Sequence, residues 1–209
     1  MVSDSVAGMS TAFADDWPVA ADRQGRLFVI SGPSGVGKGT VVRRVLELDS
    51  TLYYSVSAKT RAPRPGEVNG REYWFVSEEQ FDGMIDRGEL LEYASMFGHR
   101  SGTPARPVEL QRIQGIDVLL EIDVQGARQI RERVPDAVLI FLEPPSQEEL
   151  IRRLKARGTE HGADLERRLQ RVDAEMAEAE RFDHRVVNDE VDRAALEVMA
   201  ILERYGHTA

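Results

Sequence analysis

The residues best suited to chemistry form a glycine-rich stretch near the start of the chain. Residues 28–40 read Phe-Val-Ile-Ser-Gly-Pro-Ser-Gly-Val-Gly-Lys-Gly-Thr. Gly32, Gly35 and Gly37 allow successive backbone N–H groups to turn towards one anion. Lys38 adds a positive charge at the start of a predicted helix. A glycine-rich turn between strand and helix is the simpler alternative, but the apolar runs on both sides favour a phosphate-binding loop.

Composition limits the functions that this chain can have. Its 209 residues suit one domain, or one domain with inserted lobes, and 42% hydrophobic residues suffice for an ordinary core. The chain has no cysteine, which excludes disulfides, zinc–thiolate sites and thiol catalysis. A formal charge of −9 argues against a nucleic-acid-binding surface spread over the whole protein, so no nucleic acid is expected as a partner.

The start of the chain lacks the basic region and apolar stretch of a secretory signal. We therefore interpret residues 1–25 as a flexible N-terminal tail or a misassigned start, and expect a cytoplasmic protein. No run of eighteen apolar residues occurs, so no membrane association is expected. A monomer and a homodimer are equally compatible with the sequence.

The pattern along the chain predicts an α/β fold with a parallel five-stranded sheet. Short apolar runs typical of buried strands occur at Leu27–Ser31, Tyr53–Val56, Val118–Asp123, Val138–Leu142 and Arg185–Val187. Amphipathic patterns predict helices at Thr40–Leu48, Ser146–Arg157, Leu165–Phe182 and Ala194–Tyr205. Ser146 and Glu149 have the spacing of a capping box.

The segment between the second and third strands has a different pattern. Asn69-Gly70 is a strong local hairpin signal and is followed by β-type residues at 73–76. A short helix is predicted from Ser77 to Asp86. These features predict a small α+β lobe inserted into the parallel core.

Arginines gather in two places. Arg61 and Arg64 lie in a loop stiffened by prolines, where two guanidinium groups suit a phosphate, although a solvated basic loop explains them equally well. Arg153 and Arg157 are four residues apart and share one helix face, and Arg168 lies on the next predicted helix. These three can close over a triphosphate, but taken alone they are better explained as a solvated face.

Acidic residues mark two further positions. Glu121 and Asp123 end an apolar strand, and the carboxyl end of a parallel strand is where open α/β sheets bind ligands. A carboxylate there can hold Mg²⁺ through water or orient a substrate. Glu92 lies among apolar residues of the lobe and complements the N1–H and N2–H₂ donors of guanine, unless it is a strand residue facing solvent.

These motifs together resemble the guanylate kinases. The resemblance extends from about Arg26 to Tyr205 and rests on Ser55-Val-Ser57, Thr60-Arg61-x-Pro-Arg64-x-Gly-Glu-Val-Asn-Gly, Tyr73, Ile122-Asp123-x-Gln-Gly126 and Arg157-Gly-Thr-Glu. It implies a P-loop kinase of purine metabolism that transfers a phosphoryl group from ATP to GMP or dGMP, with Mg²⁺ as cofactor. Its domain would span 26–205, with a core of 26–58, 116–150 and 170–205, a GMP-binding lobe of 59–115 and a helical lid of 151–169.

The resemblance also implies residue roles. The ATP-binding residues would be Gly32, Pro33, Ser34, Gly35, Val36, Gly37, Lys38, Gly39, Thr40 and Asn188. The GMP-binding residues would be Ser57, Arg61, Arg64, Tyr73, Glu92, Thr103, Glu121 and Asp123. The catalytic residues would be Lys38, Arg61, Arg153, Arg157 and Arg168.

Two positions depart from the family pattern. Gly39 occupies the place of a usual serine, so a protein hydroxyl near Mg²⁺ is missing or comes from Thr40, and the metal is expected to depend mostly on water and phosphates. Ser101 occupies the place of a tyrosine that usually helps hold the GMP phosphate. We therefore expect weaker GMP binding than is typical of the family.

Two rival functions follow from the same residues. Guanylate-kinase-like domains of scaffold proteins bind without catalysis, but they have degraded nucleotide residues, whereas Lys38 and the lid arginines are present here. Another nucleoside-monophosphate kinase is disfavoured by the guanine-reading positions. For the predicted kinase no general base is needed, because a GMP phosphate oxygen is already anionic; in-line positioning and charge neutralisation would supply the catalysis.

Overall fold

The computed structural model describes residues 23–96, 98–156 and 172–208. Its core strands are β1 (Leu27–Ser31), β2 (Tyr53–Tyr54), β7 (Val118–Glu121), β8 (Val138–Glu143) and β9 (His184–Val187). The strands of the lobe are β3 (Ala58–Lys59), β4 (Trp74–Phe75), β5 (Leu90–Met96) and β6 (His99–Pro104). The helices are α2 (Lys38–Leu48), α3 (Glu78–Asp86), α4 (Ala105–Ile113), α5 (Val124–Arg133), α6 (Gln147–Ala156), the 3₁₀ helix η1 (Glu178–Arg181) and α8 (Val191–Arg204).

The five core strands form one parallel sheet in the order β2-β7-β1-β8-β9, which confirms the predicted fold class. Alternate residues of β1 enter different cores. Phe28 and Ile30 pack on one face of the sheet, whereas Leu27 and Val29 pack on the other. Burial of both faces explains why the strands are continuous apolar runs.

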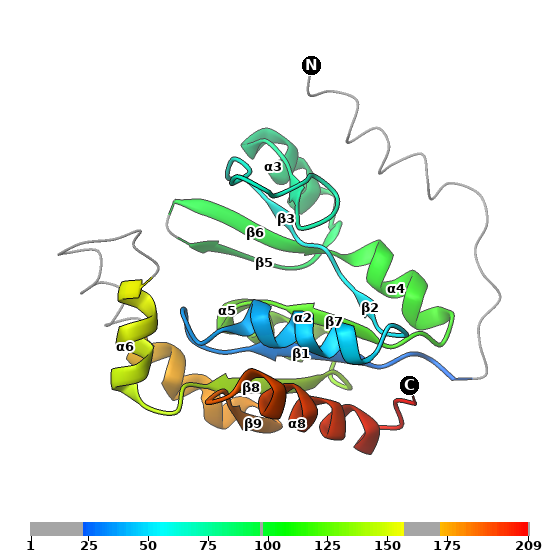
Figure 1. The fold of residues 1–209 in the computed structure, drawn as a ribbon. Helices are drawn as coiled ribbons and strands as arrows, with labels where there is room; N and C mark the ends of the chain where they lie inside the picture. Colours follow the sequence, from blue (N-terminus) through cyan, green and yellow to red (C-terminus); the bar gives the residue numbers. More distant parts are fainter. Residues whose placement is uncertain (1–22, 97, 157–171, 209) are drawn as a thin grey trace.

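Helices cover both faces of this sheet. α2 and α8 pack together on the face of Phe28, through buried residues such as Val45 and Val198 (Figure 1). α4 and α5 pack on the opposite face through Val108 and Ile130. Neither α4 nor α5 was among the helices expected from the sequence. Asp123 is the N-cap of α5, and its carboxylate accepts a hydrogen bond from Gly126 N at 2.8 Å.

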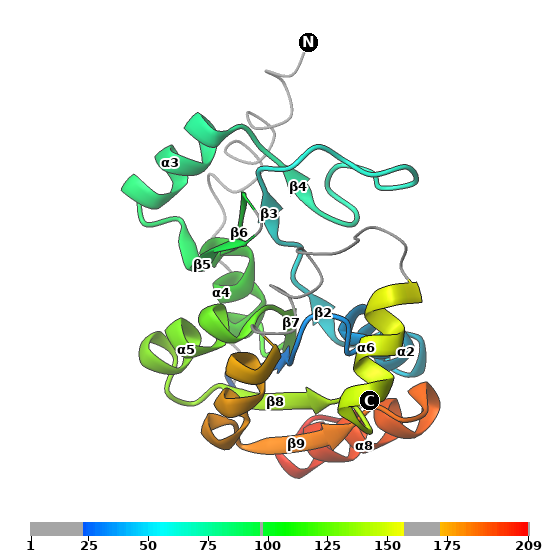
Figure 2. The ribbon, with the colours of Figure 1, turned by 90° about the vertical axis from the view of Figure 1, so that its left-hand side faces the viewer.

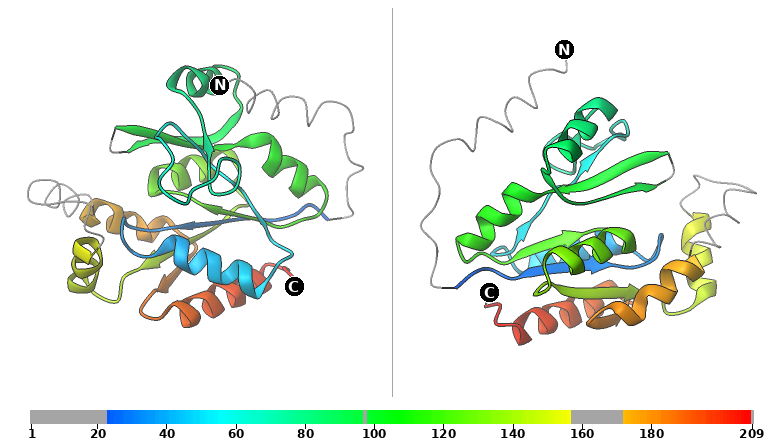
Figure 3. Two further views of the ribbon diagram at one scale, coloured as in Figure 1. Left: turned by 45° about the horizontal axis from the view of Figure 1, so that its top comes forward. Right: turned by 180° about the vertical axis from the view of Figure 1, so that it is seen from behind.

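The lobe is a second sheet in the order β4-β3-β6-β5, with α3 packed on it around the buried Phe81 (Figures 1 and 3). The hairpin signal at Asn69-Gly70 produces a tight turn, with Gly70 N donating to Tyr73 O at 2.9 Å. However, β4 after this turn pairs in parallel with β3, so the predicted hairpin is wrong. The antiparallel pairs of the lobe are β5 with β6 and β3 with β6. Leu90 of β5 is buried in one cluster with Phe81 of α3.

The segments next to the predicted lid are described in part. Ser146 caps α6 by accepting a hydrogen bond from Glu149 N at 3.2 Å, whereas the Glu149 carboxylate pairs with arginines of α6. Arg157 and Arg168 lie outside the described residues, as does most of the predicted tail. Residues 172–177 are helical, pack on α6 through Val172 and Met176, and lead into η1 beside β8 (Figure 2). No helix in the described ranges combines the length and apolar character needed to span a bilayer.

Candidate active site

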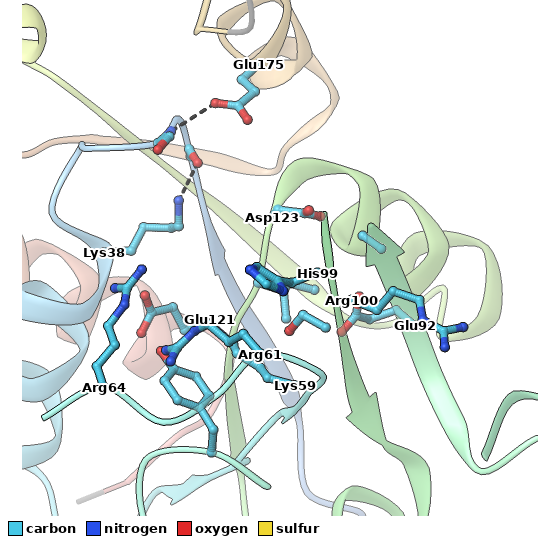
Figure 4. Close-up of a pocket in the computed structure, with 16 residues that line it drawn as sticks. Lys38, Lys59, Arg61, Arg64, Glu92, His99, Arg100, Glu121, Asp123 and Glu175 are labelled. Atoms are coloured by element: carbon cyan, nitrogen blue, oxygen red, sulfur yellow. Dashed lines mark hydrogen bonds between the residues drawn. The ribbon is translucent and has the colours of Figure 1, made fainter. Parts of the chain in front are cut away.

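A pocket of about 390 Å³ lies between the carboxyl ends of the core strands and the lobe (Figure 4). Its size suits a small-molecule ligand. Residues predicted from the sequence form much of its wall: Gly32, Ser34, Lys38, Arg61, Arg64, Tyr73, Glu92, Glu121 and Asp123. Ser101 also lines the pocket, at the position that the resemblance places near the GMP phosphate. The remaining lining residues were not among the predicted site residues: Lys59, Ala94, His99, Arg100, Ile122 and Glu175.

The phosphate-binding loop connects β1 to α2. Gly37 has a φ of 100° at the N-cap of α2, and a Cβ there would lie 2.7 Å from Asn188 Nδ2. Lys38 Nζ donates to Gly32 O at 2.6 Å and to Pro33 O at 3.3 Å. The ammonium group therefore lies at the inner side of the loop. A small movement of the side chain would let it donate to a bound phosphate.

A carboxylate already contacts this loop. Glu175 Oε2 accepts a hydrogen bond from Ser34 N at 2.9 Å, and the bond is drawn in Figure 4. Glu175 comes from the helical segment 172–177, far along the chain from Ser34. An acidic side chain on an amide of this loop shows that the loop accepts a negative charge. The local sequence around Glu175 carries no signal for this role.

Glu121 and Thr40 lie on different sides of the start of α2. A Cβ built at Gly39 would lie 3.4 Å from both carboxylate oxygens of Glu121. Thr40 instead lines a second hollow together with Arg153 and Asn188. Within the described residues, no three His, Cys, Asp or Glu side chains form a metal-binding group. The oxygen atoms of Glu121 and Thr40 are donors of the kind that Mg²⁺ prefers.

Arg153 lies outside the lining of the first pocket. Its NH1 donates to Val36 O at 3.2 Å and to Asn188 O at 3.1 Å, and its Nε pairs with Glu149 at 2.7 Å. Asn188 Nδ2 also donates to Val36 O, at 2.7 Å. Both side chains therefore support the outer side of the phosphate-binding loop and border the second hollow.

The loop of Arg61 and Arg64 is organised by Glu67. Arg61 forms a bidentate pair with this carboxylate, with N···O distances of 2.6 and 2.7 Å, and Arg64 N donates to it at 2.7 Å. Because Arg61 donates to the carboxylate, the pKa of Glu67 falls to about 2. The Arg64 side chain extends towards Lys38 (Figure 4). The basic loop is therefore a preformed part of the pocket wall.

Lys59 adds another positive charge to this wall. Its Nζ lies 3.7 Å from the centre of the Tyr73 ring, and Arg61 Cζ lies 5.3 Å from the same centre. Burial, with the charge of Arg61 as a further cause, lowers the pKa of Lys59 to about 8. Lys59 directly precedes the Thr60-Arg61 motif, and this position could have identified it as a residue of the pocket.

Glu92 lies at the other end of the pocket and is 3% exposed, so it does not face solvent. Its Oε1 accepts a hydrogen bond from the buried Thr103 hydroxyl at 2.6 Å. Burial, with the Asp123 charge as a smaller cause, raises the pKa of Glu92 to about 7. Ser57 is also buried nearly completely, but it lies outside the pocket lining. The Glu92–Thr103 pair offers hydrogen-bond acceptors to a ligand with N–H donors.

Comparisons with known proteins agree with this geometry. The sequence model of the family described as "Guanylate kinase" matches residues 24–205. A guanylate kinase of Nocardia farcinica is 52% identical over 181 residues, which cover 86% of this chain and 94% of that protein. A guanylate kinase of Thermus thermophilus is 50% identical over 179 residues, with coverage of 86% and 81%.

A solved structure supports the same relationship. The crystal structure of guanylate kinase from Anaplasma phagocytophilum aligns with a TM-score of 0.75 and 34% identity, and it covers 90% of this chain and 89% of that chain. The pocket, the family match and the relatives over most of the chain therefore lead to one conclusion. The chain belongs to the guanylate kinase family of enzymes.

Proposed function

We propose that this enzyme transfers the γ-phosphoryl group of ATP to GMP, giving ADP and GDP, and that it also accepts dGMP. The observation that carries this proposal is the arrangement of one pocket. Lys38 and the phosphate-binding loop lie at one end, Glu92 lies at the other, and basic residues line the space between them. Such a pocket suits two nucleotides whose phosphates meet in the middle.

The ATP side would consist of the loop from Gly32 to Thr40. Its amides and Lys38 would hold the β- and γ-phosphates, and Asn188 would lie near the adenine. Mg²⁺ would neutralise phosphate charge, held by phosphates and water with Glu121 close by. Thr40 remains the proposed hydroxyl near the metal, although its place in the second hollow makes this contact indirect.

The GMP side would read both ends of the nucleotide. Glu92, supported by Thr103, would accept the N1–H and N2–H₂ donors of guanine, with Ser57 and Asp123 nearby. Arg61, Arg64 and Tyr73 would hold the GMP phosphate. Arg61 would keep its pair with Glu67 and donate its remaining N–H groups to the phosphate.

The transfer step needs charge neutralisation more than proton transfer. The attacking GMP phosphate oxygen is already anionic, so Lys38 and the arginines would stabilise charge as the γ-phosphoryl group moves between the two nucleotides. Arg153, Arg157 and Arg168 are the proposed lid arginines. Arg153 would have to leave its backbone partners to reach the transferring group.

Water must be excluded while ATP is bound. We propose that the lobe 59–115 and the lid 151–169 close over the core 26–58, 116–150 and 170–205 when both substrates are present. ATP and GMP would be the only required partners, without nucleic acid or membrane. A cytoplasmic location and a monomer or homodimer complete the proposal.

The direct test is an ADP-release assay with GMP, dGMP, AMP, UMP and CMP in parallel, with and without Mg²⁺. ADP formation that depends on GMP or dGMP and on Mg²⁺ is the expected result. Equal rates with AMP would assign the pocket to another nucleoside monophosphate. Binding of GMP without turnover would support a binding module instead.

A further inference from the structure

Lys59 occupies a position in the pocket that no role yet explains. It lies on β3 and pairs across the sheet with Ser101 of β6. Side chains of directly opposite residues in an antiparallel pair lie side by side, with Cβ atoms about 5 Å apart. Both residues line the pocket. A long basic side chain therefore lies next to a very short one, facing the same space.

The surroundings of Lys59 leave its ammonium group available to an anion. Its contact within the described residues is with the face of the Tyr73 ring, and no carboxylate there forms an ion pair with it. Arg61, by contrast, has a bidentate partner in Glu67. A largely buried ammonium group keeps its N–H donors satisfied best when a bound anion accepts from them.

We propose that Lys59 binds the phosphate of GMP, as a third cation beside Arg61 and Arg64, in space that the small side chain of Ser101 leaves open. This inference rests on the proposed function. The phosphate is the chemical match, because Lys59 has three donors and no acceptor, whereas the base edge of guanine suits the acceptors of Glu92. The ATP phosphates are assigned in the proposed function to Lys38, which lines the same pocket from the loop between β1 and α2.

Lys59 also changes the GMP affinity expected from the sequence. Ser101 occupies the place of a tyrosine that is usual in the family. The sequence therefore predicts weaker GMP binding, because the phenol contact to the phosphate is missing. Lys59 supplies a charged donor from the strand next to Ser101. A hydrogen bond from a charged group is worth more than one from a neutral hydroxyl. The pair of Lys59 and Ser101 thus replaces one phosphate contact with another.

The test compares GMP with guanosine by calorimetric binding. Lys59→Met should weaken GMP binding about tenfold or more, as expected for the loss of one charged hydrogen bond. Guanosine, which lacks the phosphate, should bind equally to both proteins. Arg87→Met is the matched control, because Arg87 is an exposed cation of the lobe outside the pocket, paired with Glu89. Its GMP affinity should equal that of the wild type.

Two further variants separate binding from structure. Adding Ser101→Tyr to Lys59→Met should recover part of the lost GMP affinity, which a merely misfolded lobe would not do. In the wild type, GMP affinity should fall as pH rises above 8, where free Lys59 loses its proton. Lys59→Arg should abolish this fall, because arginine stays protonated.

Other groups around Lys59 leave that pH window clear. Pairing between Glu67 and Arg61 lowers the pKa of Glu67 and raises the pKa of Arg61, and burial raises the pKa of Tyr73, so none of these three groups titrates just above pH 8. Equal GMP affinity in wild type and Lys59→Met would overturn the inference and leave the proposed function intact. Equal losses for GMP and guanosine would overturn it as well. A wild-type protein that binds no GMP would overturn both.

Discussion

The carboxylate of Glu175 accepts a hydrogen bond from the backbone N–H of Ser34, with an O···N distance of 2.9 Å. These residues are separated by 141 positions in the chain, so only the fold brings them together. The amides of the phosphate-binding loop are the groups that would hold the ATP phosphates. In the proposed function, Glu175 and ATP would therefore compete for the same loop.

Removal of the Glu175 charge should strengthen ATP binding. In Glu175→Gln the amide oxygen still accepts from Ser34 N, but the negative charge near the incoming phosphates is gone. We expect the KM for ATP to fall by about two- to fivefold, with a smaller effect at high salt. Glu180→Gln, an equal change of charge at an exposed residue of η1, should leave KM unchanged. A higher KM for ATP in Glu175→Gln would mean that Glu175 positions the loop.

Removal of the Lys38 charge should stop turnover without unfolding the protein. The contacts of Lys38 to Gly32 O and Pro33 O lie at the partly buried edge of the loop, so the core does not depend on them. Lys38→Ala should lower kcat by about 10³-fold, because charge stabilisation in phosphoryl transfer would be lost. Near-normal GDP formation by a folded Lys38→Ala protein would contradict the assigned role. Circular dichroism and the melting temperature check the fold.

The buried Glu92 carboxylate should lower the free energy of unfolding at neutral pH. Its raised pKa, about 7, means that the folded protein holds a proton which the unfolded chain releases at lower pH. The free energy of unfolding of the wild type should therefore decrease as pH rises from about 4.5 to 7, relative to Glu92→Gln. At about 1.4 kcal/mol per pKa unit, the Gln variant should gain up to about 3 kcal/mol over the wild type at pH 8.

The same variant should lose activity with GMP. A neutral amide offers one acceptor and two donors, whereas the ionised carboxylate accepts both N–H donors of guanine. We expect kcat/KM for GMP to fall at least about tenfold, while the KM for ATP stays unchanged. Urea unfolding at several pH values measures the first effect, and steady-state kinetics measure the second. A stability difference that does not change with pH would contradict the burial argument.

Serine substitutions at two glycines of the same loop should have opposite effects. At Gly39 a Cβ meets Glu121 at an ordinary contact distance of 3.4 Å, and loss of a helical glycine should add roughly 0.5 kcal/mol of stability. The added hydroxyl lies next to Glu121, so half-maximal activity should need less Mg²⁺. At Gly37 the φ of 100° and the 2.7 Å approach to Asn188 Nδ2 should cost about 1 kcal/mol or more.

Melting temperatures and magnesium titrations of the two variants provide the measurement. Equal destabilisation by Gly39→Ser and Gly37→Ser would show that the start of α2 tolerates no side chain at either position. An unchanged magnesium requirement in a stable Gly39→Ser protein would show that a hydroxyl at position 39 does not help to hold the metal.

Local patterns in the sequence were enough to predict the strands of the core sheet. Buried parallel strands are uniform apolar runs, so β1, β7 and β8 could be located directly. α5 was missed because its segment, VQGARQIRER, has a low apolar content and depends on a few residues such as Ile130 for packing. The turn at Asn69-Gly70 was identified correctly, but its strand pairing was not, because partner choice depends on contacts far along the chain.

The sequence by itself determined which chemical groups this protein has: a phosphate-binding loop, a basic loop, and carboxylates after a strand and within the lobe. Spacing within short segments carries that information, because loop and helix geometry are local. Only the tertiary structure decided what each group contacts. It placed Arg61 on Glu67, Glu175 on Ser34 and Lys59 beside Ser101. Except for the Arg61–Glu67 pair within one loop, these contacts join distant segments, and long-range packing alone sets their distances.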